Sequence, residues 1–432
     1  TDISRDVDRS GANSLKLRIL QQAQLEQISL LVQQRVQPLL SACAISQMTL
    51  YSLQLPTNDF TGFAFVGYAW VASWFCGDYE LARHFLQLGL QQAHQQRSTE
   101  SPERGLANTE GVFINQELID KRALSSISAD LRHSSQIQHW FEPLPQVLKQ
   151  LKQIANSSKK AGDELLQSEL RLLMHQVALV SSDQSLSKAL QRCDKHYQQM
   201  LVQQHFQAAR LKESTVQLIH YLQDKALLPA EAHYDNAWQA SALIQAALLL
   251  DQQSLWPQMY QWQARLENEL PGYFIISETL FCTAMMRLIQ SQQEQQLSRR
   301  RQRIIEQIES RFELWAQYCP ENFSAQLTLL RAEKASLQQQ LNSVGRFSEP
   351  LAFKKPGEKA NPMQPSDAAA LYEQALAELK QQTRPYHKAL AYERYGHYLH
   401  VTQQPRLAQF CRDEAKRLYQ AWGASAKVKL LH

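Results

Sequence analysis

The chain has 432 residues, of which 44% are hydrophobic, enough for two or three domains or for one long repeat array. Its 13 glycines and 15 prolines are few for this length, which disfavours a turn-rich β fold. The net charge is +4 and the basic residues are dispersed, so neither nucleic acid nor a membrane surface is an expected partner. We therefore expect an all-α protein with at least about two thirds of its residues in helices and no sheet.

The N-terminal sequence TDISRDVDRS has no apolar segment of the kind found in signal peptides, and no apolar run approaches the length of a membrane span. The cysteines are far apart and show neither metal nor redox spacing, so we expect buried, reduced thiols at positions Cys43, Cys76, Cys193, Cys282, Cys319 and Cys411. These features predict a cytoplasmic protein with no metal and no cofactor.

Helical spacing of apolar residues begins near Ser14 and continues to Leu55, with Pro38 as a break or a first helical turn. A helical hairpin follows over residues 63–95, with its turn at Gly77–Asp78. Trp70 and Trp74 lie four residues apart and share a face of its first helix. The two side chains either pack between helices or form a platform for a ligand or partner.

The middle of the chain alternates long helical segments with short turns. Residues 97–108 are polar and contain Pro and Gly, which predicts an exposed loop. Helices are expected over residues 164–180, 186–222, 233–250, 255–270 and 275–289, with a stop at Leu270–Gly272. The segment 290–303 is polar on every face, as in a solvated connector or a basic contact for an acidic partner.

The C-terminal residues 366–432 fit one helix–turn–helix unit of a tetratricopeptide repeat, whose length is about 34 residues. Tyr392, Gly396, Ala408 and Ala415 occupy the aromatic and small-residue positions of this repeat without a gap. The small residues allow the two helices to approach closely. We therefore predict an α-solenoid of antiparallel hairpins, with degenerate repeats over residues 1–342, a flexible insertion over 343–365 and a repeat unit over 366–432.

Several landmarks give the chain a family resemblance. They include HWFEPLPQVLKQL, ELPGYFIISETLF, FELWAQYCPENF, ALYEQALAELK, KALAYERYGHYLH and YQAWGASAKVKLL. The chain resembles the helical region of large bacterial signalling proteins, in which a STAND-type P-loop ATPase precedes this region and a GAF domain with a histidine kinase or diguanylate cyclase follows it. The resemblance implies a sensor or scaffold that couples a protein or small-molecule signal to ATPase and output domains of the same polypeptide.

The chain contains no phosphate loop, GGDEF-like loop or kinase catalytic-loop motif, so we expect no enzymatic activity and interpret the sequence as a piece of a larger protein. The alternative is a stand-alone adaptor that binds peptides in a concave groove. Glu393, His397 and His400 recur at helical spacing in repeat positions that usually face this groove. These three residues either line a binding groove, form ordinary hydrogen-bonded surface or, with a further protein ligand, bind a metal ion.

Overall fold

The computed structural model describes residues 37–58, 60–99, 129–160, 164–202, 206–231, 233–343, 367–382 and 384–431, together with a few positions between 18 and 28. Helices account for 84% of the described residues, and no strand occurs among them. The prediction of an all-α chain is therefore confirmed. The solenoid of tetratricopeptide-like repeats stays a prediction. Within the described ranges, no helix has both the length and the apolar character needed to cross a bilayer.

The chain forms two compact units, each assembled from segments that are distant in the sequence. Unit 1 contains residues 1–141, 149–170 and 267–274, and unit 2 contains residues 142–148, 171–266 and 275–432. The first helices of unit 1 are α2 (Pro38–Gln54), α3 (Thr61–Val71) and α4 (Tyr79–Thr99). Short π-helical and 3₁₀ turns follow α3 and precede α6 (Leu144–Lys160).

The core of unit 1 lies where α3 packs against α2 and α4. Gly89 of α4 is required there, since a Cβ atom on it would lie 2.7 Å from the backbone nitrogen of Val66. Gly67 of α3 is in similarly close contact with Ile45 of α2. The predicted hairpin turn also forms, with Gly77 in the left-handed conformation that glycine tolerates.

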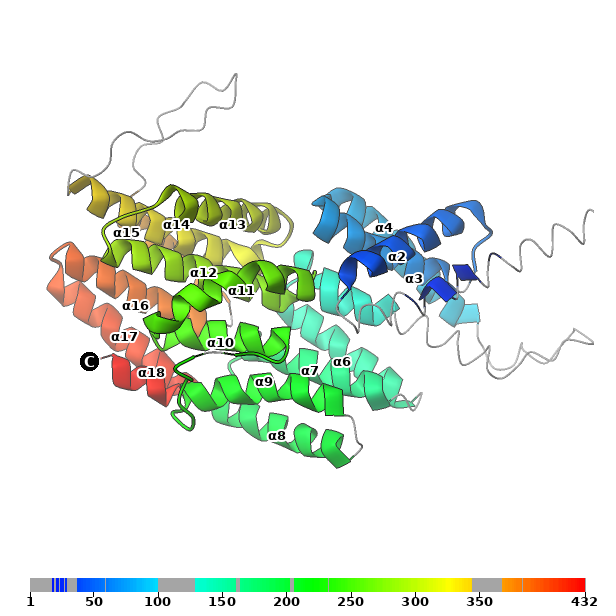
Figure 1. Cartoon of the computed structure of the whole chain (residues 1–432), viewed down its shortest axis with the longest axis horizontal. Coiled ribbons are helices and arrows are strands. Elements are labelled where there is room, and N and C mark those ends of the chain that lie inside the picture. The colour runs from blue at the N-terminus through cyan, green and yellow to red at the C-terminus, as the bar shows by residue number, and fades with distance from the viewer. Residues whose placement is uncertain are drawn as a thin grey trace, which may run out of the picture. The chain divides into compact units, whose positions relative to one another are not determined.

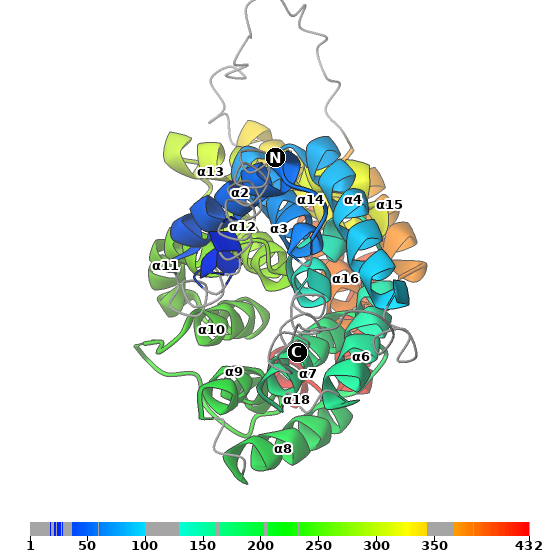
Figure 2. The same ribbon diagram turned by 90° about the vertical axis from the view of Figure 1, so that its right-hand side faces the viewer.

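Figure 1 shows the helices of unit 2, labelled in chain order. Their bounds are α7 (Glu164–Ser181, shared with unit 1), α8 (Leu186–Val202), α9 (Phe206–Leu222), α10 (Ala237–Leu249), α11 (Trp256–Glu269), α12 (Phe274–Gln293), α13 (Arg299–Tyr318), α14 (Pro320–Ser343), α15 (Ala368–Lys380), α16 (Pro385–Val401), α17 (Pro405–Trp422) and α18 (Ser425–Leu430). Figure 2 shows α8, α9 and α10 side by side in chain order, and their mutual contacts agree with this view.

Local sequence chemistry explains several helix starts in unit 2. Asn236, Ser298 and Asp367 each accept a hydrogen bond from a backbone N–H in the first turn of the following helix. Pro385 and Pro405 begin α16 and α17, where a missing N–H has no cost. These residues lie at the starts of their helices, where local chemistry favours a boundary.

The hairpin of α16 and α17 has the close approach expected from its small residues. A Cβ atom on Gly396 would lie 3.2 Å from the carbonyl oxygen of Ala408 and 3.3 Å from Cβ of Cys411. Ala408 and Ala415 are fully buried, whereas Tyr392 is half-buried. Gly423 ends α17 in the left-handed conformation, and α18 follows directly.

Two expectations need correction. The segment 186–222 forms two helices, α8 and α9, rather than one. Among the cysteines, Cys43 and Cys76 are exposed, so the expectation of six buried thiols is wrong for these two, although all six are free. Both lie on helices whose other faces supply the core contacts. Apart from Ser343, the predicted insertion over 343–365 lies outside the described residues. Residues 100–108 of the predicted loop also lie outside them.

Candidate functional site

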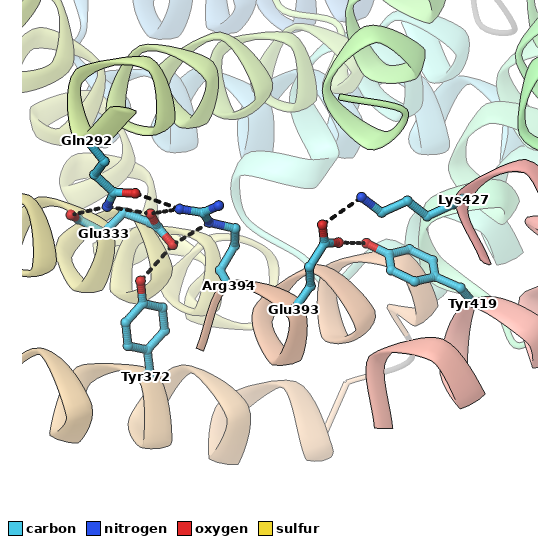
Figure 3. A network of polar contacts seen from close by, with 7 residues as sticks. All are labelled: Gln292, Glu333, Tyr372, Glu393, Arg394, Tyr419 and Lys427. Atoms are coloured by element: carbon cyan, nitrogen blue, oxygen red, sulfur yellow. Dashed lines mark hydrogen bonds and ion pairs between the residues drawn. The ribbon is translucent and has the colours of Figure 1, made fainter. Parts of the chain in front are cut away.

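The predicted groove residues of α16 have different surroundings. Glu393 accepts a hydrogen bond from Tyr419 Oη on α17 (3.0 Å) and pairs with Lys427 Nζ on α18 (2.6 Å), as Figure 3 shows. The side chains of His397 and His400 are exposed. The pKa of His397 is lowered, because partial desolvation and the charge of Arg394 disfavour the imidazolium. Glu393 therefore links α16 to α17 and α18. That His397 and His400 line a binding groove stays a prediction.

The predicted tryptophan pair belongs to the interior of unit 1. Trp70 is 0% exposed and donates through Nε1 to the carbonyl oxygen of Pro271 (3.0 Å). The Arg132 guanidinium lies over the Trp70 ring, 5.1 Å from its centroid. Trp74 is half-buried and stacks on Trp140 with a centroid separation of 6.3 Å. In this structure the packing reading describes both rings.

A buried ion pair between Glu333 of α14 and Arg394 of α16 lies in the interior of unit 2. Arg394 donates through Nε and Nη2 to the two oxygens of Glu333, over 2.9 and 3.0 Å (Figure 3). Tyr372 Oη of α15 and Gln292 Nε2 of α12 also donate to this carboxylate, over 2.7 and 2.9 Å. Gln292 Oε1 in turn accepts from Arg394 Nη2 (2.6 Å). The network thus joins four helices through hydrogen-bonded side chains.

These contacts fix the ionisation of Glu333. Burial opposes the charged carboxylate, but the charge and hydrogen bonds of Arg394 outweigh burial and lower the pKa of Glu333. Burial raises the pKa of Tyr372, and the adjacent carboxylate raises it further. Tyr372 is therefore a neutral donor to an ionised acid.

A second buried acid, Glu278 of α12, forms a separate network. It accepts hydrogen bonds from Tyr386 Oη of α16 and from Gln326 Nε2 of α14 (3.0 Å), and His387 Nε2 lies 3.0 Å from Glu278 Oε2. Burial again opposes ionisation, but His387, Arg384 and Tyr386 together lower the pKa of Glu278. The same face of α16 that carries Arg394 thus also anchors α12 and α14 near its N-terminal end.

A pocket of about 440 Å³ opens beside this second network. It lies at the N-terminal ends of α6, α14 and α16 and at the C-terminal ends of α7 and α15, all within unit 2. Its lining residues are Pro143, Leu144, Pro145, Ser181, Pro320, Glu321, Asn322, Ser324, Glu378, Gln381, Gln382 and Arg384. The volume lies within the usual range for small-molecule sites.

Asn322 holds two walls of this pocket together. Its Oδ1 accepts from the backbone N–H of Leu144 (3.0 Å), and its Nδ2 donates to the carbonyl oxygen of Glu142 (2.8 Å). The start of α6 is thereby fixed to the start of α14. These two bonds join wall segments that are 178 and 180 positions apart in the sequence.

Arg384 is the buried cation of the pocket wall. Its side chain is 3% exposed, and Nη1 lies 4.0 Å from Glu278 Oε1. Within the described part of the chain, Nη1 and Nη2 form no hydrogen bond. Burial lowers the pKa of Arg384, while Glu278 acts in the opposite direction. A buried guanidinium with unused donors is an unusual and costly feature.

Among the described residues, no group of three or more His, Cys, Asp or Glu side chains is placed to hold a metal ion. No protein-family model, no curated protein and no solved structure matches the chain.

Sequence reasoning missed Glu278, Glu333, Arg384 and Arg394. One signal was present for Glu278, which stands within the apolar run FIISETLFCTAMM. A carboxylate inside such a run is buried only with partners. The partners themselves were not visible, because they come from helices distant in the sequence.

Proposed function

We propose that the chain is a non-catalytic, cytoplasmic sensor or scaffold region of a bacterial signalling protein. In this proposal the pocket beside Arg384 receives a small-molecule signal, and α18 transmits the bound state to a neighbouring domain of the same polypeptide. The landmarks CPENF and WGASAKV support it, because they resemble the helical region of STAND-associated signalling proteins. One landmark, at Cys319–Phe323, includes the pocket residues Pro320, Glu321 and Asn322.

The observation that carries the proposal is the attachment of α18. Lys427 pairs with Glu393 of α16, whose next residue, Arg394, enters the buried network of α14. Lys429 pairs with Asp224, and Ser425 Oγ donates to the carbonyl oxygen of Gln223 (2.8 Å), both just after α9. Figure 1 shows α18 beside α9 accordingly. A change in the position of α16 would therefore be passed to α18.

The experiment combines ligand screening with hydrogen exchange. Compounds that raise the melting temperature of the chain are expected to change the exchange rate of α18 amides as well. In Glu393→Gln, which weakens the bond to Lys427, the thermal shift should persist and the α18 response should fall. Glu414→Gln, which removes an exposed pair with Arg417, is the matched control. Stabilising compounds that leave α18 unchanged in the parent chain contradict the proposal.

A peptide-binding adaptor is the second candidate. Leu407 and Phe410 of α17 are 54% and 58% exposed, and their spacing places them on one face of the helix. The exposed His397 and His400 lie on the preceding helix. Selection from a random peptide library tests this function: enriched peptides should lose binding to Phe410→Asp and retain binding to Phe75→Asp, a change of an exposed aromatic in unit 1.

A further inference from the structure

We propose that the pocket beside Arg384 binds a small zwitterion, a molecule with a free carboxylate and a free ammonium group such as an amino acid or a short peptide. Arg384 receives the carboxylate, and Glu321 and Glu378 receive the ammonium group. The inference deepens the proposed function, since it names the chemical class of the signal.

We infer a ligand carboxylate because the buried guanidinium of Arg384 has donors without an acceptor among the described residues. Its nearest acid is Glu278 at 4.0 Å, and that carboxylate is already bonded to Tyr386, Gln326 and His387. The Nη donors of a guanidinium match the two oxygens of a carboxylate in geometry and charge. Both Nη atoms are buried in this structure, so a ligand carboxylate would satisfy these unused donors once the Arg384 side chain turns toward the pocket.

The need for an ammonium group follows from the acids that line the same pocket. Glu378 accepts hydrogen bonds from Thr328 Oγ1 (3.2 Å) and Gln374 Nε2 (2.9 Å), both neutral donors. Within the described ranges, Glu321 accepts a hydrogen bond only from the weak donor Cys319 Sγ (3.6 Å). Among the described residues neither acid forms an ion pair, and Glu321 is exposed.

Charge complementarity then selects the ligand class. A simple anion would meet two uncompensated carboxylates, and a simple cation would meet Arg384. A molecule with both charges satisfies both sets of groups. The remaining lining includes Pro143, Leu144, Pro145 and Pro320, which suits an apolar side chain on the ligand.

The test uses one chemical series on the whole chain. L-leucine and leucyl-leucine are the zwitterionic probes, leucinamide lacks the carboxylate, and N-acetyl-L-leucine lacks the ammonium group. Calorimetry should show saturable binding of at least one zwitterion, with binding of leucinamide and N-acetyl-L-leucine weaker by about tenfold or more. The inference is overturned if neither zwitterion binds, or if a singly charged derivative binds as tightly.

Variants assign the binding to this pocket. Arg384→Met and Glu378→Gln should each weaken binding of the zwitterion by about tenfold or more, since each removes one charge contact. Glu313→Gln changes an exposed carboxylate of α13 and should leave the affinity unchanged. Glu378→Gln alters a half-buried side chain, so it reports on the site even if Arg384→Met fails to fold. Unchanged affinity in Glu378→Gln would place the binding elsewhere.

Hydrogen exchange separates this inference from the proposed function. Zwitterion binding that leaves α18 unchanged supports the ligand class and contradicts the coupling. An α18 response to other stabilising compounds, with no zwitterion binding, supports the coupling and overturns the ligand class.

Discussion

Glu393 and Arg394 are adjacent on α16, yet Glu393 pairs with Lys427 of α18 and Arg394 pairs with Glu333 of α14. Successive residues of an α-helix differ in direction by about 100°. The two side chains therefore leave α16 toward different helices, as Figure 3 shows. One helix thereby joins the interior of unit 2 to the last helix of the chain.

Breaking the Glu333–Arg394 pair should strongly destabilise unit 2. Arg394→Met leaves Glu333 buried with no cationic partner, and we expect a loss of about 3–5 kcal/mol in the free energy of unfolding. Chemical denaturation monitored by circular dichroism measures the change. Arg417→Met, which removes an exposed pair, should cost less than about 1 kcal/mol.

The double variant Glu333→Leu with Arg394→Met tests the physical reason. Because it leaves no buried charge, it should be more stable than Arg394→Met alone. A double variant as unstable as the single one would mean that the loss comes from packing rather than from the unpaired carboxylate.

Lys427→Met should loosen α18 selectively. Lys427 is buried, and its Nζ is paired with Glu393 and lies 5.7 Å from the centroid of the Tyr419 ring. The variant leaves the carboxylate of Glu393 without its cation, so amides of α18 should exchange faster while those of α14 keep their protection. Equal protection of α18 in Lys427→Met and the parent chain would show that the contacts after α9 suffice.

His139 should make the stability of unit 1 depend on pH. Burial lowers the pKa of His139 to about 3, against about 6.5 in the unfolded chain. Between these values the unfolded state binds the proton and the folded state does not. The free energy of unfolding should therefore decrease by up to about 1.4 kcal/mol for each unit of pH below about 6.5. The loss ends near the folded pKa.

The control for this prediction is His139→Gln, which cannot titrate. The difference in unfolding free energy between parent and variant, measured from pH 7 downward by denaturant titration, isolates the histidine from the carboxylates. A difference that is constant with pH would contradict the assignment of a neutral, buried imidazole.

Adding a side chain should change stability differently at the two close helix contacts, Gly396 in the α16–α17 hairpin and Gly89 in α4. Gly396→Ala should be nearly neutral, because its closest contact is 3.2 Å and alanine favours the helix. Gly396→Leu should cost about 1–3 kcal/mol through overpacking. Gly89→Ala should cost more than Gly396→Ala, since its Cβ would lie 2.7 Å from a backbone atom. Thermal unfolding gives the order, and equal melting temperatures for all three variants would contradict these contacts.

Thiol labelling should separate the cysteines into two groups. Cys43 and Cys76 are exposed and should react with a maleimide in the native chain, whereas Cys193, Cys282, Cys319 and Cys411 are buried and should react only after unfolding. Burial, assisted by Glu321, also raises the pKa of Cys319 to about 12, which removes its thiolate. Peptide mapping identifies the labelled sites, and rapid labelling of Cys319 would contradict its burial.

The sequence by itself determined the fold class and many helix ends. Apolar spacing, the turn at Gly77–Asp78 and the small residue Gly396 are local signals, because helix formation depends on residues within a few turns. These signals placed the C-terminal hairpin in its observed register. They also made Tyr392, Gly396, Ala408 and Ala415 recognisable as packing positions.

Only the tertiary structure decided which charged residues are buried and what they contact. Glu278 bonds to Tyr386 across 108 positions, and Glu333 to Arg394 across 61, so no local pattern identifies the partners of these acids. The same holds for the pocket, whose walls come from the ends of five helices and whose cation, Arg384, stands between two of them. Such sites arise where distant segments meet, and the periodicity of one helix carries no information about its neighbours in space.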